Sequence, residues 1–305
     1  MKKHILAKLG FCGLALHLAV SGQTAWADDA APKTEFEKIG YAVGLNLGSS
    51  IKQNNLPADP DFVGRAAKSV QTGAPALLTD KEVNDVLKSL PAGPANLAAD
   101  DTHFKNVRQE VGYAVGASFG KRMKRMGVDL DVDNLVKGLK DALAGGPTLL
   151  TTNEIKDILT RLQAELPAKS LKAGQNFLEK NKSQAGVKVL DDGLQYKVIN
   201  LGNGPKPKLT DTVSVNYRGT FFDGDEFDAS PPGSPIKFPL TGVIPGWTEI
   251  LQLMPTGSKW QVYIPSDLAY GPRGQAPKIS PNSTLIFDIE LLSIVPPASA
   301  APPTP

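Results

Sequence analysis

An internal repeat constrains the fold of this chain more than any other feature of its sequence. When the sequence is shifted by 72 residues, Gly40–Leu90 aligns with Gly112–Leu162 without a gap, and 19 of the 51 aligned positions are identical. Each copy opens with "GYAVG" and carries three glycines spaced four residues apart. Two copies are too few for a solenoid, so the sequence predicts a single duplication in the N-terminal half.

Each copy predicts three helices. In the first helix, a row of apolar residues runs beside a row of glycines, and both recur at every fourth position. A second helix is expected at about 61–72 and again at about 133–144, because each segment ends at a glycine with a proline beyond it. The third helix begins near Thr79 or Thr151, since each threonine stands three residues before a glutamate, the spacing of a capping box. The glycines of the two first helices are Gly40, Gly44 and Gly48, and Gly112, Gly116 and Gly120.

The glycine rows require a structural reason, because a glycine inside a helix costs about 1 kcal/mol relative to alanine. A row at i, i+4 and i+8 forms a shallow groove in which a second helix can approach closely. Lys38, Asn46 and Lys52 argue against a membrane partner for this helix. We therefore expect a contact between helices, with the alternative that each row only packs inside its own copy.

Residues 1–27 are typical of a secretory signal peptide. Lys2 and Lys3 precede an apolar run of about 12 residues, and a small-residue cleavage site ends at Ala27. No later segment approaches the roughly 20 apolar residues that a membrane-spanning helix needs. We expect a mature protein without a membrane span, located in the periplasm or secreted.

Cysteine and charge content exclude several classes of site. Cys12, the only cysteine, lies inside the apolar run and follows Phe11, whereas a lipid-anchoring cysteine normally follows a small residue. The mature chain therefore offers no disulfide, thiolate nucleophile or zinc-thiolate site. Removing the first 27 residues lowers the basic count from 33 to 30 against 31 acidic residues. This balance gives no support for nucleic acid or an anionic membrane as a general partner.

The C-terminal part of the sequence has a different pattern. A short connecting helix is expected at 168–182, directly after Pro167. From about residue 187, runs rich in β-branched and aromatic residues alternate with Gly, Pro and Asp, which indicates strands. One helical segment, 246–254, interrupts them. The simplest arrangement is an α+β domain, in which one antiparallel sheet wraps over one short helix.

The predicted organisation follows from these patterns. A turn-rich stretch at 91–96 separates the two copies. The predicted segments are a signal peptide (1–27), helical repeat 1 (28–97), helical repeat 2 (98–167), a connecting helix and linker (168–189), the α+β domain (190–296) and a disordered tail (297–305).

The inventory of side chains limits the chemistry that is available. His103 is the only histidine outside the signal peptide and lies between the two copies, which excludes a Ser-His-Asp triad and a histidine metal cluster in the C-terminal domain. No phosphate-binding glycine loop is present. The acidic stretch "FFDGDEFDAS" at 221–230 is more simply a hairpin turn than a catalytic carboxylate pair. We expect no metal and no cofactor.

Large apolar and aromatic side chains lie close to glycines and turns in the C-terminal domain. Together they exceed what one small sheet and one helix need for a core, and tyrosine and tryptophan add polar groups that a pocket can use. They line a binding pocket or, on the simpler interpretation, fill an ordinary core. The residues are Tyr217, Phe227, Phe238, Val243, Ile244, Trp247, Tyr270 and Phe287.

Three segments of the C-terminal domain resemble the diagnostic motifs of FKBP-type peptidyl-prolyl isomerases. They are "VNYRGTFFDGDEFDAS", "VIPGWTEILQLMPTGSKWQVYIPSDLAYG" and "PNSTLIFDIELLSI", and the resemblance covers about residues 193–295. Residues 36–166 resemble the N-terminal helical domain of the Mip-like secreted bacterial members, which is a dimerisation module in that family. The resemblance accounts for the whole mature chain and implies the α+β fold of the family.

The resemblance also implies a substrate pocket with Trp247 as its floor. Asp228 is expected at the rim beside Tyr217, while the Ile244 backbone N–H and the Tyr270 hydroxyl are expected to bond to the bound peptide. The implied catalytic residues are Tyr217, Phe227, Asp228, Val243, Ile244, Trp247, Tyr270 and Phe287. The implied substrate-binding residues are Ile236, Phe238, Gln275 and Ile279. Ile236 and Gln275 depart from the aromatic residue and the histidine that are frequent there, which bears on substrate preference and on affinity for macrolides, the candidate inhibitors.

The activity implied is peptidyl-prolyl cis-trans isomerisation of proline-containing unfolded or exported polypeptides. This reaction needs no acid, base or nucleophile, because a dry aromatic pocket and hydrogen bonds to a twisted amide suffice. The alternative is a protein-binding chaperone module with weak or no isomerase activity. A purely structural oligomer is harder to reconcile with so complete a set of pocket residues.

The duplication changes what the resemblance implies for assembly. In the family, two chains contribute one helical domain each and intertwine, whereas this chain carries two copies. We therefore expect the two copies to pair with each other, giving a pseudo-dimer with one isomerase domain per particle. A homodimer is the alternative.

Overall fold

The computed structural model describes residues 31–90 and 103–295. The predicted signal peptide with Cys12, the turn-rich stretch 91–96 and the tail 297–305 lie outside the described residues. The main division of the chain into two compact units falls between Lys169 and Ser170. The first unit is helical and contains both copies of the repeat, and the second contains the sheet.

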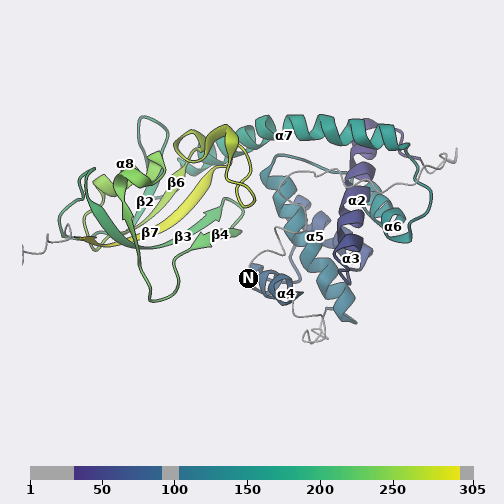
Figure 1. Ribbon diagram of the computed structural model, residues 1–305, viewed down its shortest axis with the longest axis horizontal. Coiled ribbons are helices and arrows are strands. Elements are labelled where there is room, and N and C mark those ends of the chain that lie inside the picture. Colours follow the sequence, from purple (N-terminus) through teal and green to yellow (C-terminus); the bar gives the residue numbers. More distant parts are fainter. Residues whose placement is uncertain (1–30, 91–102, 296–305) are drawn as a thin grey trace, which may run out of the picture. The chain divides into compact units, whose positions relative to one another are not determined.

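The helical unit has the three helices per copy that the repeat predicts, and the second helix of each copy begins one residue before the expected start and ends where expected (Figure 1). Each copy supplies a long first helix, a shorter second helix and a third helix that begins at the expected cap. In the first copy these are α2 (Glu35–Gln53), α3 (Pro60–Thr72) and α4 (Asp80–Ser89), and in the second copy they are α5 (Val107–Arg125), α6 (Val132–Ala144) and α7 (Thr152–Asn181).

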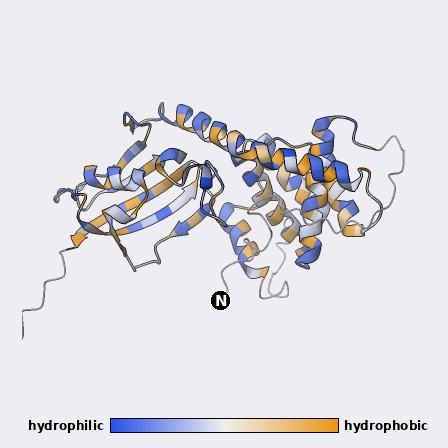
Figure 2. Ribbon diagram, turned by 45° about the horizontal axis from the view of Figure 1, so that its top comes forward, coloured by the Kyte–Doolittle hydropathy of each residue, from blue (hydrophilic) through white to orange (hydrophobic). Residues whose placement is uncertain are grey.

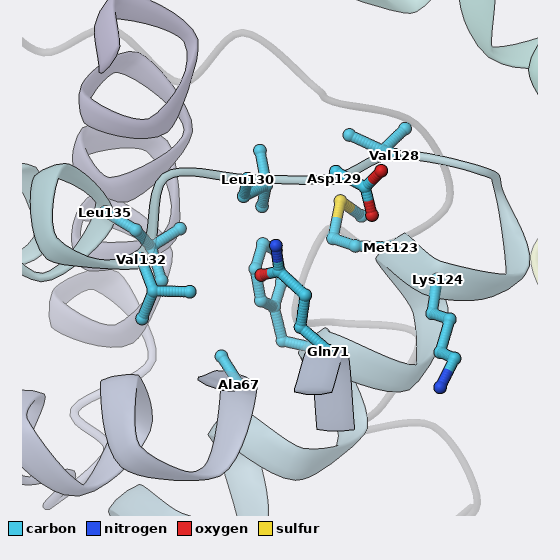
Figure 3. Close-up of a pocket in the computed structure, with 11 residues that line it drawn as sticks. Ala67, Gln71, Met123, Lys124, Val128, Asp129, Leu130, Val132 and Leu135 are labelled. Atoms are coloured by element: carbon cyan, nitrogen blue, oxygen red, sulfur yellow. The ribbon is translucent and has the colours of Figure 1, made fainter. Parts of the chain in front are cut away.

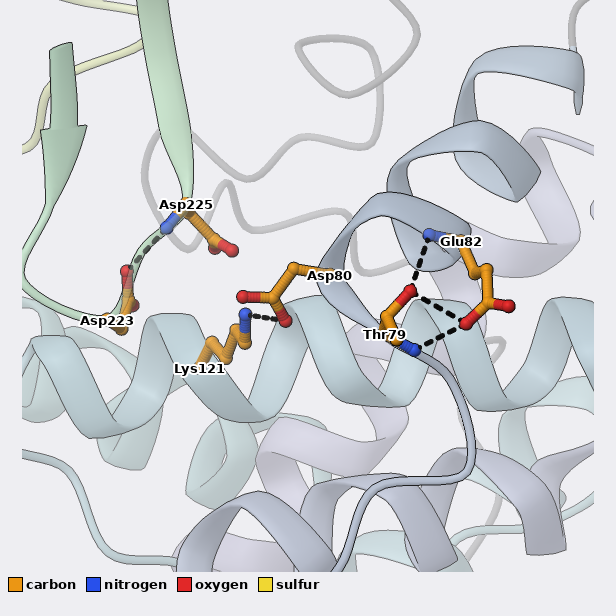
Figure 4. Close-up of polar contacts among 6 residues, drawn as sticks. All are labelled: Thr79, Asp80, Glu82, Lys121, Asp223 and Asp225. Atoms are coloured by element: carbon orange, nitrogen blue, oxygen red, sulfur yellow. Dashed lines mark hydrogen bonds and ion pairs between the residues drawn. The ribbon is translucent and has the colours of Figure 1, made fainter. Parts of the chain in front are cut away.

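Local caps explain where these helices start and stop. At the start of α4, Thr79 Oγ1 accepts a 3.3 Å hydrogen bond from Glu82 N, and Thr79 N donates to Glu82 Oε2 at 2.7 Å (Figure 4). This reciprocal pair satisfies backbone groups that the first turn leaves unpaired. At the other end of the second helices, Gly73 and Gly145 adopt left-handed φ angles of 73° and 72°. Such angles suit glycine and end a helix.

The glycine row of α2 lies directly against α6 of the other copy. A Cβ atom added at Gly40 or Gly44 would lie 2.5 Å from the Asp131 carbonyl oxygen or 2.1 Å from the Leu135 carbonyl oxygen. At Gly48 a Cβ would lie 2.7 Å from the Ala142 Cβ. No side chain fits at these distances, so the two backbones approach as closely as they do only because the row is glycine.

The same contact occurs in the reverse direction. A Cβ at Gly112 or Gly116 on α5 would lie 2.4 Å from the Asp59 carbonyl oxygen or 2.2 Å from the Val63 carbonyl oxygen, both of the first copy. The first helix of each copy therefore packs on the second helix of the other copy. The alternative in which each row packs only inside its own copy is wrong.

Hydrogen bonds and the core also cross between the copies. Tyr41 OH donates to Asp141 Oδ2 at 2.6 Å and accepts from Leu149 N at 3.0 Å. The equivalent tyrosine of the second copy, Tyr113, accepts from Leu77 N at 2.8 Å. A single cluster of buried apolar residues draws on both copies. The duplicated segments thus form one body with shared packing.

α7 departs from the prediction of a separate connecting helix after Pro167. It is one helix from Thr152 to Asn181, and Pro167 lies inside it (Figure 1). A proline inside a helix removes one backbone hydrogen bond and costs about 3 kcal/mol. Leu162 is buried before it, and Ser170 and Leu178 are buried after it. Packing on both sides of the proline offsets this cost.

The second unit contains a seven-stranded antiparallel sheet among the described residues. The strand order is β1-β2-β6-β7-β3-β4, and β5 also pairs with β3. The helix α8 (Pro245–Leu253) follows β5, so the predicted α+β class is confirmed. The strands are β1 (Val187–Val189), β2 (Gln195–Asn200), β3 (Thr212–Phe221), β4 (Glu226–Ala229), β5 (Ile236–Pro239), β6 (Lys259–Ile264) and β7 (Leu285–Val295).

Helices pack on both faces of the sheet. Hydrophobic and hydrophilic residues are mixed along the strands (Figure 2), and inward residues such as Val215 and Ile289 pack in one cluster with Ile250 of α8. The end of α7 contributes a second contact, in which Phe177 stacks on Phe222 with ring centroids 5.1 Å apart. The sequence predicted the packing of α8 on the sheet, and it predicted a helix at 168–182 without its contact with the sheet.

Polar contacts fix the end of α7 on the sheet. Asn181 Nδ2 donates to Gln195 Oε1 at 2.9 Å, and Gln195 Nε2 donates to the Leu178 carbonyl oxygen at 2.9 Å. Both side chains are buried. A buried amide pair of this kind is stable because each group finds a partner away from water.

The acidic stretch after β3 forms the expected hairpin. Gly224 has a φ of 89°, and its N–H donates to the Phe221 carbonyl oxygen at 3.0 Å. The Asp223 side chain accepts from Asp225 N at 3.2 Å within the turn (Figure 4). The hairpin interpretation of "FFDGDEFDAS" is confirmed.

Across residues 31–90 and 103–295, no helix combines the length and the apolar character that a membrane crossing requires.

The glycine contacts predict a large effect of one added methyl group. Gly44→Ala would place a Cβ 2.1 Å from the Leu135 carbonyl oxygen and force α2 away from α6. We expect a loss of about 1–3 kcal/mol in the free energy of unfolding, although alanine favours the helix. Urea denaturation followed by circular dichroism measures this loss. Gly146→Ala is the control, because a Cβ there meets nothing within 4 Å, and equal stability of the two variants would contradict the close contact.

A carboxyl group on α8 predicts a pH-dependent stability. Burial and a hydrogen bond with the Asp192 side chain raise the pKa of Glu249 to about 7. In an unfolded chain the pKa of glutamate is about 4.3, so the folded state binds the extra proton between these values. The stabilisation is complete below a pH of about 4.3 and is lost as the pH rises through about 7. We expect Glu249→Gln to melt like wild type near pH 4 and at a higher temperature than wild type at pH 8, measured by calorimetry. A constant difference across this range would contradict the shifted pKa.

Candidate functional site

The centre of the candidate site is Trp247, in the first turn of α8. Its side chain is only 4% exposed. Three aromatic rings stand nearly perpendicular to the indole: Tyr217 at 5.3 Å and 85°, Phe238 at 5.6 Å and 83°, and Phe287 at 5.2 Å and 83°, between centroids. Edge-to-face contacts of this kind are favourable for aromatic rings. The indole is thereby held rigidly between strands β3, β5 and β7.

A further aromatic wall comes from β4. Phe227 stands at 90° to Phe287, with centroids 5.5 Å apart. Gly219 of β3 makes room for both rings, because a Cβ there would lie 2.7 Å from the Phe227 ring and 2.9 Å from the Phe287 ring. Gly219 is not among the predicted site residues. Its position inside the "NYRGTFF" strand was the available signal, since a glycine within a strand marks close approach of a neighbour.

Two tyrosine hydroxyls and one carboxylate supply the polar part of the site. Tyr217 OH donates to Asp228 Oδ2 at 2.7 Å. Burial, followed by the hydrogen bond and charge of Asp228, holds the pKa of Tyr217 above its usual value. Burial and the Asp228 charge also raise the pKa of Tyr270. Both hydroxyls therefore remain protonated at neutral pH and act as hydrogen-bond donors.

The loop that follows Tyr270 has a defined backbone. After a short 3₁₀ helix (Gly271–Arg273), Gln275 and Ile279 exchange two hydrogen bonds of 2.8 Å between their backbone groups. Gly274 allows this turn with a φ of 61°. The Ile279 side chain is 2% exposed and belongs to the core cluster, whereas Gln275 is exposed. The structure thus places Ile279 with the aromatic residues and Gln275 at the outer edge of the loop.

The segment before α8 contributes Val243 and Ile244. Both side chains are half-buried against the same cluster as Trp247. The Ile244 carbonyl oxygen accepts from Trp247 N at 2.9 Å, and Thr248 Oγ1 donates to the Leu240 carbonyl oxygen at 2.8 Å. These bonds fix the chain at the point where it enters the helix.

Two of the predicted residues, Phe238 and Ile236, lie on β5. Phe238 pairs with Val213 of β3 and packs its ring against both Tyr217 and Trp247. Ile236 pairs with Val215 and is half-buried. Side chains two residues apart on a strand share a face, so Ile236 lies on the same face of β5 as Phe238.

The chemistry of the site is that of a cluster of aromatic rings with hydrogen-bond donors beside it. The Trp247 Nε1–H is buried and finds no acceptor among the described residues. His103, the only histidine in the part of the chain that the structure describes, belongs to the helical unit. The site can desolvate a neutral group and donate hydrogen bonds to it.

Comparison with known proteins connects both units to one family. A family model for FKBP-type peptidyl-prolyl cis-trans isomerase matches residues 204–292. A second model, for the domain amino-terminal to FKBP-type peptidyl-prolyl isomerase, matches residues 108–198. The first match covers most of the sheet and α8, and the second covers the second helical copy and α7.

Three curated relatives show how far the similarity extends. The outer membrane protein MIP of Legionella longbeachae is 44% identical over 226 residues, which are 70% of this chain and 97% of the relative. The FKBP-type peptidyl-prolyl cis-trans isomerase FkpA of Escherichia coli (strain K12) is 42% identical over 224 residues, which cover 67% of this chain and 82% of the relative. The peptidyl-prolyl cis-trans isomerase Mip of Coxiella burnetii is 38% identical over 205 residues, which cover 63% of this chain and 89% of the relative.

The identity with these relatives extends over both the helical and the sheet-containing parts of their chains. The predicted family is confirmed, and with it the class of reaction. The chain belongs to the FKBP-type peptidyl-prolyl cis-trans isomerases, in the Mip-like branch of that family.

Proposed function

We propose that the pocket over Trp247 binds the residue–proline pair of a polypeptide and isomerises it without covalent or acid/base chemistry. The observation that carries this proposal is the set of three rings held perpendicular to a buried indole. The compact, apolar proline ring fits against such a floor, and the surrounding rings exclude water from the amide bond.

The proposed mechanism uses the electronic difference between a planar and a twisted amide. Resonance makes the planar amide charge-separated and gives it a rotation barrier of about 18–20 kcal/mol. A twisted amide has lost this resonance and is less polar, so a dry pocket destabilises the ground state relative to the transition state. A differential stabilisation of about 5 kcal/mol would accelerate isomerisation several thousandfold.

Hydrogen bonds give the pocket its orientation. We assign the Tyr270 hydroxyl and the Ile244 N–H as donors to the carbonyl groups of the bound peptide. Tyr217 is already bonded to Asp228 at 2.7 Å, so this pair is assigned to the rim, where it holds Tyr217 in place. Phe227, Val243, Phe287 and Ile279 complete the walls, and Ile236, Phe238 and Gln275 contact the residues around the proline.

The proposed substrates are exported polypeptides that wait for slow X-Pro isomerisation, which takes tens of seconds without a catalyst. The predicted signal peptide supports a periplasmic or secreted location. One relative, from Legionella longbeachae, bears the name outer membrane protein.

We further propose that the mature protein is monomeric. Helices α2 and α5 carry the glycine grooves that a second chain would need, and α6 and α3 of the same chain already occupy these grooves. Because the two helical copies of one chain pair with each other, each particle carries one isomerase domain. Light scattering on the mature protein is expected to give the mass of one chain, and a dimer mass would refute the proposal.

The alternative function is a chaperone module that binds unfolded chains and catalyses little. Refolding of a protein that is limited by one cis-proline distinguishes the two, because an isomerase accelerates this phase and a holding chaperone slows it.

The proposed mechanism predicts that the two tryptophans of the sheet-containing unit differ in function. Trp247→Phe shortens the floor of the pocket, and we expect kcat/KM in the refolding assay to fall about tenfold or more, equivalent to about 1.4 kcal/mol. Trp260→Phe is the matched control. Trp260 is also 4% exposed but stacks on Tyr196 at 4.7 Å, away from the proposed substrate.

Full activity in both Trp247→Phe and a folded Trp247→Ala would contradict desolvation by the indole as the source of catalysis. Circular dichroism on each variant checks that the fold is intact, since removal of a buried tryptophan costs about 3–5 kcal/mol.

A further inference from the structure

A pocket lies in the helical unit, among α3, α5 and the start of α6 (Figure 3). It holds about 60 Å³ and is open on one side. Phe119, Met123 and Leu135 form its buried apolar part. Nothing in the proposed isomerase mechanism uses this pocket.

The internal repeat shows why the pocket exists. Residues 72 positions apart are equivalent, so Ala67 of α3 corresponds to Leu139 of α6, and Gln71 corresponds to Leu143. In the second copy, Leu139 is fully buried. Its Cδ1 lies 3.2 Å from the position that a Cβ atom would take if one were added to Gly48.

The equivalent position of the first copy is not filled in the same way. At Gly120, the atom of residue 67 nearest to the place of a Cβ is the backbone Cα of Ala67, at 3.1 Å. The first copy lacks the leucine side chain that occupies this position in the second copy. The pocket is therefore a local departure from the pseudo-symmetry of the two copies.

The rim of the pocket is polar and carries no net charge. Its polar residues are Gln71, Lys124 and Asp129, all of them exposed. Lys124 Nζ donates to the Val70 carbonyl oxygen at 3.1 Å and points away from the pocket in Figure 3. The Gln71 carboxamide points toward Leu130 and has no hydrogen-bond partner in the described chain. One neutral group that can both donate and accept therefore stands at the opening.

We propose that this pocket receives one branched aliphatic side chain of an extended polypeptide, and that the Gln71 carboxamide bonds to the peptide group beside it. The apolar floor of the pocket matches the aliphatic side chain of such a ligand, and the free carboxamide of Gln71 matches its peptide group. A neutral rim favours a peptide over a fatty acid or a phosphate, which would need a cation turned toward them.

The size of the pocket selects among side chains. An engineered apolar cavity of about 150 Å³ accommodates benzene. The pocket is less than half as large, so an aromatic ring is too big, and the three or four carbons of valine, leucine or isoleucine suit it. The enzyme acts on polypeptides, which present such side chains when unfolded.

The methyl group of Met123 provides a direct readout. The probe is the blocked peptide Gly-Ser-Leu-Ser-Gly, added to the full mature chain with ¹³C-labelled methionine methyl groups. We expect a saturable shift of the Met123 signal and none of Met254, which is buried in the other unit. The same peptide with alanine in place of leucine should bind at least tenfold more weakly. Absence of a saturable Met123 shift, or an equal affinity for both peptides, would overturn the proposal.

A variant that restores the repeat separates a binding site from a packing defect. Ala67→Leu fills the pocket. We expect this variant to have a higher melting temperature than wild type and an affinity for the leucine peptide that is at least tenfold lower. Ala164→Leu, on the exposed face of α7, is the matched control and should bind the peptide as wild type does. Unchanged binding in Ala67→Leu would refute the site.

Three further measurements keep the test decisive. If Ala67→Leu does not fold, Gln71→Leu at the exposed rim is tested in its place. We expect this variant to keep the fold and to bind the leucine peptide more weakly than wild type does. Saturation of the Met123 shift by decanoate but not by the peptide would show a fatty-acid site and reject the proposed ligand. Isomerase activity on a short proline peptide should be the same in wild type and Ala67→Leu. The inference is therefore independent of the proposed catalytic mechanism.

Discussion

Backbone contact between helices of different copies is the constraint on which the helical unit depends. Gly44 lies against the Leu135 carbonyl group and Gly116 against the Val63 carbonyl group, at distances that leave no room for a Cβ atom. A helix bearing three interior glycines is poor on its own, and the dispersion attraction between closely packed backbones offsets that weakness. Each copy thereby lacks a complete core until the other copy is in place. The tyrosines follow the same rule, since Tyr41 and Tyr113 each bond to the loop before the third helix of the opposite copy.

The sheet-containing unit uses a glycine for a related purpose. Gly219 leaves space in β3 for Phe227 and Phe287, which then stand at right angles beside Trp247. The rings are positioned by strands β3, β4, β5 and β7 and by α8, and all of these elements pack into one core. Rigid walls matter for the proposed mechanism, because a pocket that relaxed around the planar amide would lose the difference between ground and transition states.

Local patterns predicted the elements of this protein well, and contacts between distant segments limited the rest. The capping threonines and the apolar periodicity of the copies depend on neighbours in sequence, so the starts of α4 and α7 could be placed from Thr79 and Thr151. The family motifs predicted the aromatic residues that meet at Trp247. The helix through Pro167 could not be predicted, because its stability depends on burial of Leu162 and Leu178 at separate sites. The position of Gly219 inside a strand signals that a neighbour approaches closely, but no local pattern identifies the two rings from other strands that do so.

Fusion of the two copies into one chain permits differences that a homodimer cannot have. In a symmetric dimer, one residue must serve at both equivalent positions, whereas here Tyr41 bonds to Asp141 while the equivalent of that aspartate, Ser69, donates to the Ala74 carbonyl oxygen instead. The same freedom allows Leu139 to fill its half of the core while Ala67 leaves a pocket in the other half. A cavity costs stability in proportion to its volume, and in a symmetric dimer that cost would be incurred twice. The fused chain incurs it once, so a pocket of this kind is more easily tolerated here than in a dimer of identical chains.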